Sequence, residues 1–310
     1  MKKLIIVSGT HRSGTSWIGK TLCSTRENYY INEPFNPSNR INNAGYIKDE
    51  YWPLSLEEYE LILPSINNII NGRYPYINNI KNSNSLKDYL KTNYYYFHFL
   101  KSKLNIKKTN YIIKDPFLLF LIEEINQFFS NTFEIHINIT FKDPISFVSS
   151  CKKKNWDFDF DNLLKQKNIH LKFTDLQIER MSELKKSKYS LVHRLTFLWE
   201  LCNLQILRIA SIKNVHICNH REFSLDPIAK FKKLFKINNI KFCESVESFI
   251  IDTCFSKRVS QDTKFSQDIK RNSIDVLNEG RKYLTNSELE YIINEQDQNY
   301  KNILKKINFV

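Results

Sequence analysis

Short apolar runs alternate with helical patterns along the chain. The first apolar run, residues 4–7, is followed by a glycine-rich turn. After this turn, apolar side chains recur at helical spacing at Trp17, Ile18 and Leu22. The order predicts a strand, a turn and a helix.

The same order returns three more times, and an Asp-Pro pair marks the start of each helix. The pairs begin at Asp115, Asp143 and Asp226, and the last follows a strand expected at about 215–219. Aspartate can accept exposed backbone N–H groups at a helix start, and proline fits the first helical position. Strands alternating with helices predict an α/β three-layer sandwich with a central, mainly parallel sheet. A ligand site is expected at the carboxyl ends of the strands.

Further helical patterns lie between and after these units. Residues 54–72 and 85–104 have polar-aromatic helical patterns, and residues 193–210 form a long pattern with a wide apolar stripe. A last helix is expected near the end of the sequence, with Thr285 or Ser287 close to its start.

Composition indicates a globular protein. Of the 310 residues, 42% are apolar and 14% are aromatic, and no linker rich in proline, glycine or serine interrupts them. We therefore expect a single domain over residues 1–310, with helical insertions at about 39–110 and 156–212.

The apolar runs and the cysteines indicate a cytoplasmic protein. The longest runs, such as residues 117–122, are far too short to span a bilayer, and no signal-peptide pattern follows the first lysines. The six cysteines are scattered without a C-x-x-C pair, which favours free thiols in a reducing compartment. Neither a disulfide framework nor a metal site is predicted.

The net charge of +13 raises the question of a nucleic-acid partner. The lysines are dispersed, however, and the basic runs at 152–154 and 185–188 are short. No nucleic-acid-binding motif accompanies them, so no nucleic-acid partner is predicted. A positive field would still attract an anionic cofactor or substrate.

The glycine-rich turn has the spacing of a phosphate-binding loop. From Gly9 to Ser16 the sequence follows G-x-x-x-x-G-T-S, one residue different from the phosphate-binding pattern G-x-x-x-x-G-K-[ST]. Thr15 stands where nucleotide-hydrolysing proteins have lysine, and Arg12 lies inside the loop. Such a turn presents several backbone N–H groups to one anion, helped by the helix dipole. The hydroxyls of Ser13, Thr15 and Ser16 are expected to add donors. The chemistry indicated is transfer of a compact anionic group without an obligatory metal.

The stretch "SGTHRSGTSW" resembles the 5′-phosphosulfate loop of sulfotransferases that use 3′-phosphoadenosine 5′-phosphosulfate (PAPS). A second stretch, "TFKDPISFVSS", resembles the family's 3′-phosphate motif, in which a serine lies eight positions after a basic residue. The resemblance implies a P-loop NTPase-like topology, with the 5′-phosphosulfate bound by Arg12, Ser13, Gly14, Thr15, Ser16 and Trp17. It also implies that Lys142, where the family usually has arginine, and Ser150 hold the 3′-phosphate.

Two further positions match the family more weakly. His220 takes the place of an aromatic ring near the adenine, and Arg258 or Lys257 stands in for a late basic loop. The stretch "IIKDPFLLF" resembles a Lys-x-Pro segment of bacterial members. The resemblance thus covers nearly the whole chain.

A base is needed to accept the proton of the acceptor hydroxyl. The segment "YYINEPFNP" resembles a Glu-Pro segment that carries the catalytic glutamate in a few bacterial members, which implies Glu33 as the base. Next to aromatic side chains, the pKa of Glu33 is expected to be raised. The alternative is that Glu33 caps a turn or pairs with a lysine. His98 and His136 are weaker candidates for the base.

The function expected from the resemblance is transfer of a sulfuryl group from PAPS to a hydroxyl acceptor. The aromatic and polar insertions favour a saccharide, glycan or lipid-linked sugar as acceptor, while the oligomeric state is not predicted. Three alternatives stay open: a P-loop kinase that lost its lysine, a basic polyanion-binding protein without catalysis, and a degenerate, inactive sulfotransferase.

Overall fold

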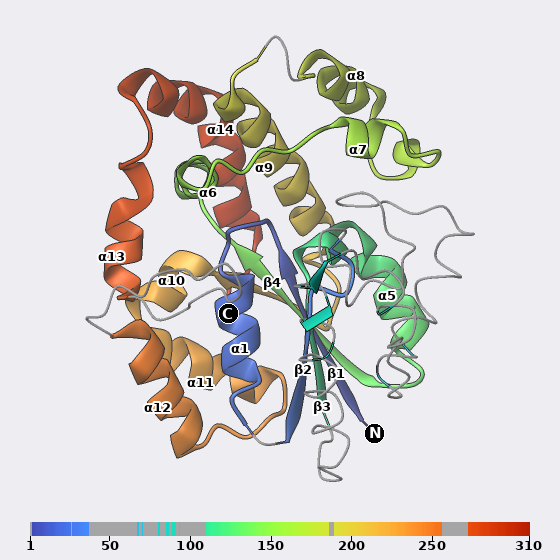
Figure 1. Cartoon of the computed structure of the whole chain (residues 1–310), viewed down its shortest axis with the longest axis vertical. Coiled ribbons are helices and arrows are strands. Elements are labelled where there is room, and N and C mark those ends of the chain that lie inside the picture. Colours follow the sequence, from blue (N-terminus) through green and yellow to red (C-terminus); the bar gives the residue numbers. More distant parts are fainter. Residues whose placement is uncertain are drawn as a thin grey trace.

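The computed structural model shows an α/β protein built on one central sheet (Figure 1). It describes residues 2–25, 27–36, 110–185, 189–255 and 272–310, together with isolated positions between 67 and 93. The expected helices at 54–72 and 85–104 therefore lie almost entirely outside the described residues.

The sheet has five strands in the order β2-β3-β1-β4-β5. Every neighbouring pair is parallel. The strands are β1 (Lys3–Gly9), β2 (Asn28–Asn32), β3 (Asn110–Lys114), β4 (Glu134–Phe141) and β5 (Val215–Asn219). The α/β fold with a parallel sheet and helices on both sides, expected from the alternating pattern, is confirmed.

Strand β2 was not expected from the sequence. Its residues, NYYIN, include only one aliphatic side chain, Ile31, and the strand lies at the edge of the sheet. Because an edge strand has a neighbour on one side only, it does not need the continuous apolar run that marks a central parallel strand. The apolar pattern therefore predicted four strands, whereas the described part of the chain has five.

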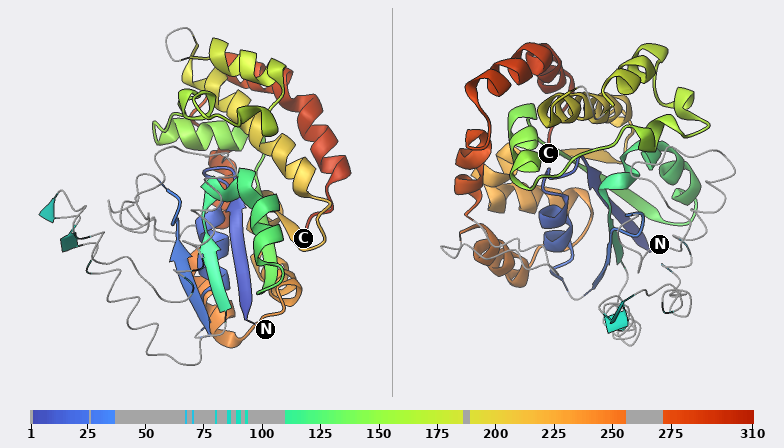
Figure 2. Two further views of the ribbon diagram at one scale, coloured as in Figure 1. Left: turned by 90° about the vertical axis from the view of Figure 1, so that its right-hand side faces the viewer. Right: turned by 45° about the horizontal axis from the view of Figure 1, so that its top comes forward.

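Helices cover both faces of the sheet (Figure 2), and apolar side chains of β1 alternate between two cores. Leu4 and Ile6 belong to the larger core, while Ile5 and Val7 belong to the smaller one, and all four are fully buried. Burial on both faces explains why this strand has a continuous apolar sequence.

The smaller core packs between the sheet and four helices. Phe231 and Leu234 are among its fully buried members. The helices are α1 (Thr15–Leu22), α10 (His220–Leu225), α11 (Pro227–Ile237) and α12 (Glu244–Cys254).

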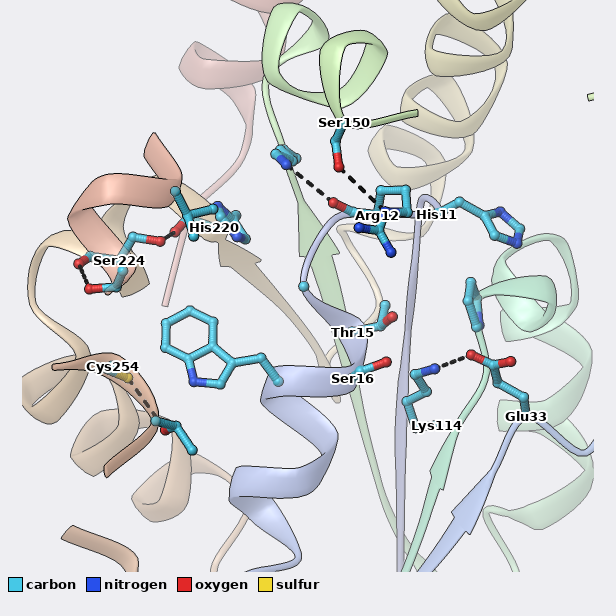
Figure 3. A pocket seen from close by; sticks show the side chains of 17 residues that line it. His11, Arg12, Thr15, Ser16, Glu33, Lys114, Ser150, His220, Ser224 and Cys254 are labelled. Atoms are coloured by element: carbon cyan, nitrogen blue, oxygen red, sulfur yellow. Dashed lines mark hydrogen bonds and ion pairs between the residues drawn. The ribbon is translucent and has the colours of Figure 1, made fainter. Parts of the chain in front are cut away.

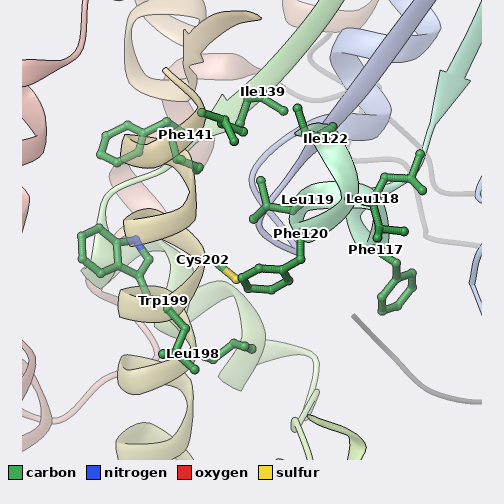
Figure 4. Close-up of a cluster of buried hydrophobic side chains, with 14 of the residues drawn as sticks. Phe117, Leu118, Leu119, Phe120, Ile122, Ile139, Phe141, Leu198, Trp199 and Cys202 are labelled. Carbon is green, nitrogen blue, oxygen red and sulfur yellow. The ribbon is translucent and has the colours of Figure 1, made fainter. Parts of the chain in front are cut away.

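The larger core lies on the opposite face, where helix α9 packs against β4 and the segment after β3 (Figure 4). Trp199 of α9, Phe120 and Phe141 are among its fully buried side chains. Its main elements are η1 (Pro116–Leu121), α5 (Ile122–Phe129), α6 (Pro144–Lys153), α9 (Leu191–Ile209) and α14 (Asn286–Lys306). Smaller elements are α7 (Asp161–Leu164), η2 (Ile169–Leu171), α8 (Asp175–Glu183), α13 (Ser273–Asn278) and η3 (Glu279–Arg281).

All three Asp-Pro pairs cap helices, as predicted. The Asp115 carboxylate accepts from the N–H of Phe117, and Asp143 accepts from that of Ser146. Asp226 caps α11 in the same way. At the start of α14, Thr285 forms a capping box with Glu288, which agrees with the predicted start.

Two further observations concern the membrane and the cysteines. Among the helices that the structure describes, none is long and apolar enough to cross a membrane. All six cysteines are described and are free thiols, four of them buried: Cys151, Cys202, Cys218 and Cys254.

Candidate active site

The loop between β1 and α1 is shaped by two glycines with positive φ. Gly9 has φ 140° and Gly14 has φ 94°. A Cβ at Gly9 would lie 2.4 Å from the carbonyl oxygen of Thr140, and one at Gly14 would lie 2.8 Å from the His220 ring. Both the backbone angle and the lack of space therefore require glycine at these positions.

The amino end of helix α1 points into a pocket. The pocket is lined by Gly14, the N-cap residue, and by Thr15 and Ser16, the first two residues of the helix. No acidic residue lies in the first turn. The first N–H groups of a helix have no intrahelical acceptor and carry a partial positive charge, which makes this end suitable for an anion.

Arg12 connects the loop with the second sequence motif. Its Nε donates to the hydroxyl oxygen of Ser150 at 3.4 Å, and Lys142 Nζ donates to the Arg12 carbonyl oxygen at 3.3 Å. Arg12 itself has φ 58°, an uncommon backbone angle for a residue other than glycine. The Lys142 carbonyl is in turn held by the buried Trp199 indole N–H at 2.8 Å. The two motifs thus meet at one point.

The pocket lies at the carboxyl ends of the strands, where the sequence predicted a ligand site. Figure 3 shows Arg12, Thr15 and Ser16 between Glu33 and Lys114 on one side and His220, Ser224 and Cys254 on the other. Other lining residues are His11, Gly14, Trp17, Pro116, Lys142, Ser150, Thr253, Ser273 and Val276. Arg12, Lys114 and Lys142 give the pocket a positive charge, and Glu33 is the only carboxylate among the lining residues that the structure describes.

Glu33 forms an ion pair with Lys114, at the end of the neighbouring strand β3. Burial alone would raise the pKa of this carboxyl, but the Lys114 ammonium and the Asn36 amide hold the pKa below its ordinary value. The expected raised pKa is therefore wrong, and Glu33 does pair with a lysine, while its role as a base stays a prediction.

Lys114 was not expected at the site, although the sequence contained a signal for it. Lys114-Asp115-Pro116 repeats Lys142-Asp143-Pro144 at the end of another strand. The Lys114 stem packs near Gly19 and the Tyr30 ring, so that the side chain is only 1% exposed. This packing directs the ammonium toward Glu33.

His11 is a second lining residue that sequence analysis missed. Its ring stacks on Trp156 at 4.6 Å and meets the edge of Phe117 at 4.4 Å. Burial, opposed by Glu33, lowers the pKa of His11 to about 3, so the ring is neutral near pH 7. A histidine beside an anion loop carries no distinctive spacing, and its partners are distant in sequence.

Trp17 and His220 occupy the other side of the pocket. Their ring centroids are 6.1 Å apart, and the Trp17 ring also contacts Phe231 at 5.3 Å. Burial lowers the pKa of His220 to about 3, and the nearby charge of Lys142 acts in the same direction.

The Ser13 hydroxyl does not lie where the sequence predicted it, at the anion site. Its buried hydroxyl is within hydrogen-bond distance of the carbonyl oxygen of Thr10 and the hydroxyl of Thr140, and Ser13 does not line the pocket. The expectation that this hydroxyl serves an anion is therefore wrong, because the side chain turns toward β4 and braces the loop.

Four other sequence candidates lie away from the pocket or outside the described residues. His136 pairs with Glu134 at the start of β4, at the opposite end of the strand from Lys142. His98, Arg258 and the alternative Lys257 lie outside the described residues.

Solved structures of sulfotransferases resemble this chain over nearly its whole length. A sulfotransferase domain from the curacin biosynthetic pathway is 11% identical with a TM-score of 0.48, the alignment covering 96% of this chain and 97% of that one. A sulfotransferase domain of the Synechococcus olefin synthase is 11% identical with a TM-score of 0.43, and the alignment covers 95% of this chain and 93% of that one. A Mycobacterium avium sulfotransferase is 13% identical with a TM-score of 0.41, and the alignment covers 99% of this chain and 78% of that one.

The sequence comparisons gave no match. No protein-family model matches the chain. No curated protein matches it either. All three structural likenesses have low identities of 11–13% and TM-scores below 0.5.

Proposed function

We propose that this protein is a sulfotransferase that moves a sulfuryl group from PAPS to a hydroxyl acceptor. The observation that supports this most is the meeting of Arg12 with both Ser150 and Lys142 beside the amino end of α1. One anion site at a helix start and a second cluster of donors next to it suit a nucleotide with phosphates at two positions.

The donors around the pocket fit PAPS in chemical terms. Arg12, Thr15 and Ser16, with the first N–H groups of α1, would hold the 5′-phosphosulfate, while Lys142 and Ser150 would hold the 3′-phosphate. On the other side, Trp17 and His220 offer aromatic surface for the base. When bound, PAPS supplies an activated sulfuryl group with adenosine 3′,5′-bisphosphate (PAP) as the leaving group.

Arg12 would stabilise the charge that develops on the transferred group and on the bridging oxygen. Transfer of this kind resembles phosphoryl transfer, in which positioning and charge stabilisation supply most of the rate. The guanidinium plane presents several fixed donors to such a group.

Glu33 would accept the proton of the acceptor hydroxyl. Since Lys114 and Asn36 keep the pKa of Glu33 low, its carboxylate is ionised near neutral pH and needs no prior loss of a proton. When Glu33 takes up the proton, the Lys114 charge is released from the ion pair and can balance charge on the neighbouring transferred group.

The acceptor that we propose is a sugar hydroxyl on a saccharide, glycan or lipid-linked sugar. The support is the His11 ring, which lines the pocket together with Glu33 and stacks on Trp156, since flat rings of this kind are surfaces that sugars pack against. We also propose a cytoplasmic location, which is supported by the six free thiols.

A P-loop kinase is less well supported by the same pocket. Thr15 replaces the lysine of such loops, and Glu33, the only lining carboxylate in the described part, already pairs with Lys114. Kinases of this type use further acidic residues to hold Mg²⁺.

Calorimetric binding of PAP, AMP and ATP to the purified protein tests the proposal without knowledge of the acceptor. We expect PAP to bind at least tenfold more tightly than AMP, because only PAP carries the 3′-phosphate. Equal affinity for PAP and AMP, or a preference for ATP with Mg²⁺, would contradict it.

A further inference from the structure

The backbone at Glu33 needs external support. Glu33 has φ 46°, in the left-handed region that residues other than glycine rarely adopt. Such an angle is unfavourable for glutamate, so it persists only where surrounding contacts impose it. The Glu33 N–H donates to the Lys114 carbonyl oxygen at 2.7 Å, which extends the pairing of β2 with β3 by one residue.

The side chain of Asp115 holds the turn two residues after Glu33. The Phe35 N–H donates to Asp115 Oδ2 at 2.6 Å, and the Phe35 ring is 4% exposed. Asp115 itself is fully buried, although aspartate is among the residues least often buried. Its backbone N–H donates to the Val7 carbonyl oxygen at 2.9 Å, which fixes it to the central strand β1.

Both carboxyl oxygens of Asp115 accept a hydrogen bond from a backbone N–H. While Oδ2 accepts from Phe35, Oδ1 accepts from the Phe117 N–H at 3.0 Å and caps η1. Burial and, next, the charge of Glu33 raise the pKa of Asp115 to about 8, while the two backbone donors and Lys114 favour its ionised form. The other two Asp-Pro pairs differ, since Asp143 and Asp226 have a capping contact with their own helix only.

We propose that Asp115 is a positioning residue for Glu33: its carboxyl group ties the turn that carries Glu33 to the end of β3. The contact fixes the chain on one side of Glu33, and the Lys114 carbonyl fixes it on the other. The role attributed to Glu33 rests on the proposed function, whereas the tie itself is a property of the fold.

Asp115→Asn separates the tie from the helix cap. Asparagine caps helices about as well as aspartate, but it has one oxygen instead of two. Because the remaining oxygen is expected to keep the local cap on the Phe117 N–H, the Phe35 N–H loses its acceptor. The matched control is Asp226→Asn, at an Asp-Pro pair that only caps its helix.

Hydrogen exchange of the peptide covering residues 28–36 tests the tie without any activity assay. In Asp115→Asn we expect the Phe35 amide to exchange roughly tenfold faster or more, with no change in Asp226→Asn. Unchanged exchange would overturn the proposal. Asp115→Ser, which also keeps a single acceptor, replaces the first variant if that one does not fold.

Turnover of PAPS with a simple alkyl glycoside, methyl glucoside, as a probe acceptor tests the consequence for Glu33, because its hydroxyl groups need a base. We expect kcat of Asp115→Asn to fall by about a hundredfold, as for a misplaced reacting group, with the PAP dissociation constant within about twofold of the wild type. Loss of PAP binding in parallel with kcat would indicate a general structural role and overturn the proposal. If the wild type neither binds PAP nor consumes PAPS, the proposed function fails, and the exchange experiment still decides whether Asp115 holds the turn.

Discussion

The Nζ atom of Lys142 lies 3.3 Å from the carbonyl oxygen of Arg12, a residue 130 positions earlier in the chain. Strand β4, which ends just before Lys142, lies beside β1, which leads into the loop that contains Arg12. Parallel pairing brings the carboxyl ends of both strands to the same edge, so two separate sequence motifs form one cationic pocket.

Replacement of Arg12 tests its role in transfer. We expect Arg12→Ala to lower the turnover of PAPS by roughly a thousandfold or more, because a fixed cation at the transferred group is lost. Arg208→Ala is the control, since Arg208 is half exposed and pairs with Glu123 away from the pocket. Turnover within a few fold of the wild type in Arg12→Ala would show that Arg12 has no such role.

Replacement of Lys142 tests the proposed 3′-phosphate site. In Lys142→Ala the affinity for PAP should fall by about tenfold or more, while the affinity for AMP changes little, because AMP has no 3′-phosphate. Calorimetry with both nucleotides measures the difference. A similar loss for both nucleotides would mean that Lys142 only supports the loop through the Arg12 carbonyl.

Glu33→Gln should abolish transfer while PAP binding persists, because the amide cannot accept the hydroxyl proton. The low pKa of Glu33 gives a second expectation. The carboxylate stays ionised as the pH falls toward its ordinary pKa of 4.5, so Glu33 causes no loss of rate between about pH 5 and 8. An NMR titration in which the Glu33 carboxyl carbon shows a midpoint near pH 6 would contradict the lowered pKa.

Gly14→Ala should destabilise the protein by about 1–3 kcal/mol, because alanine disfavours φ 94° and its Cβ would approach the His220 ring. Urea unfolding measures this loss. Combining the change with His220→Ala removes the contact but leaves the backbone angle, so only part of the stability should return. Complete recovery would show that the angle itself costs nothing.

Stability should fall as the pH is lowered below about 6.5, because the pKa values of His11 and His220 are lowered from 6.5 to about 3. Above pH 6.5 both rings are neutral in the folded and unfolded states. Below it the unfolded chain binds protons that the folded protein does not, and each histidine removes up to about 1.4 kcal/mol per pH unit. Urea unfolding between pH 7.5 and 5 should show a shallower slope in His11→Gln and His220→Gln, and slopes equal to that of the wild type would contradict these shifts.

The sequence predicted the parts of the site that depend on local pattern. A buried central strand such as β1, the glycine loop with Arg12, and the caps at Asp115 and Asp143 are recognisable because their residues are neighbours in the chain. The spacing of eight positions between Lys142 and Ser150 was also recognisable in the sequence, since both residues belong to one strand-to-helix unit.

The rest depended on strand order, which local pattern does not give. Glu33 and Lys114 are 81 residues apart and meet because β2 lies beside β3, and β2 has too few apolar residues to be found. Without this pairing, burial beside aromatic rings indicated a raised pKa for Glu33. Ser13 was likewise assigned to the anion because its contact with Thr140 requires β4 to lie next to β1.

Incubation of the wild type and Arg12→Ala with ³⁵S-labelled PAPS and a panel of saccharides shows whether the protein is a sulfotransferase. We expect the wild type to form PAP and to transfer the label to a saccharide hydroxyl without added metal, and Arg12→Ala to do neither at a comparable rate. Hydrolysis or transfer of the ATP γ-phosphate that requires Mg²⁺, with PAPS left intact by the wild type, would contradict it.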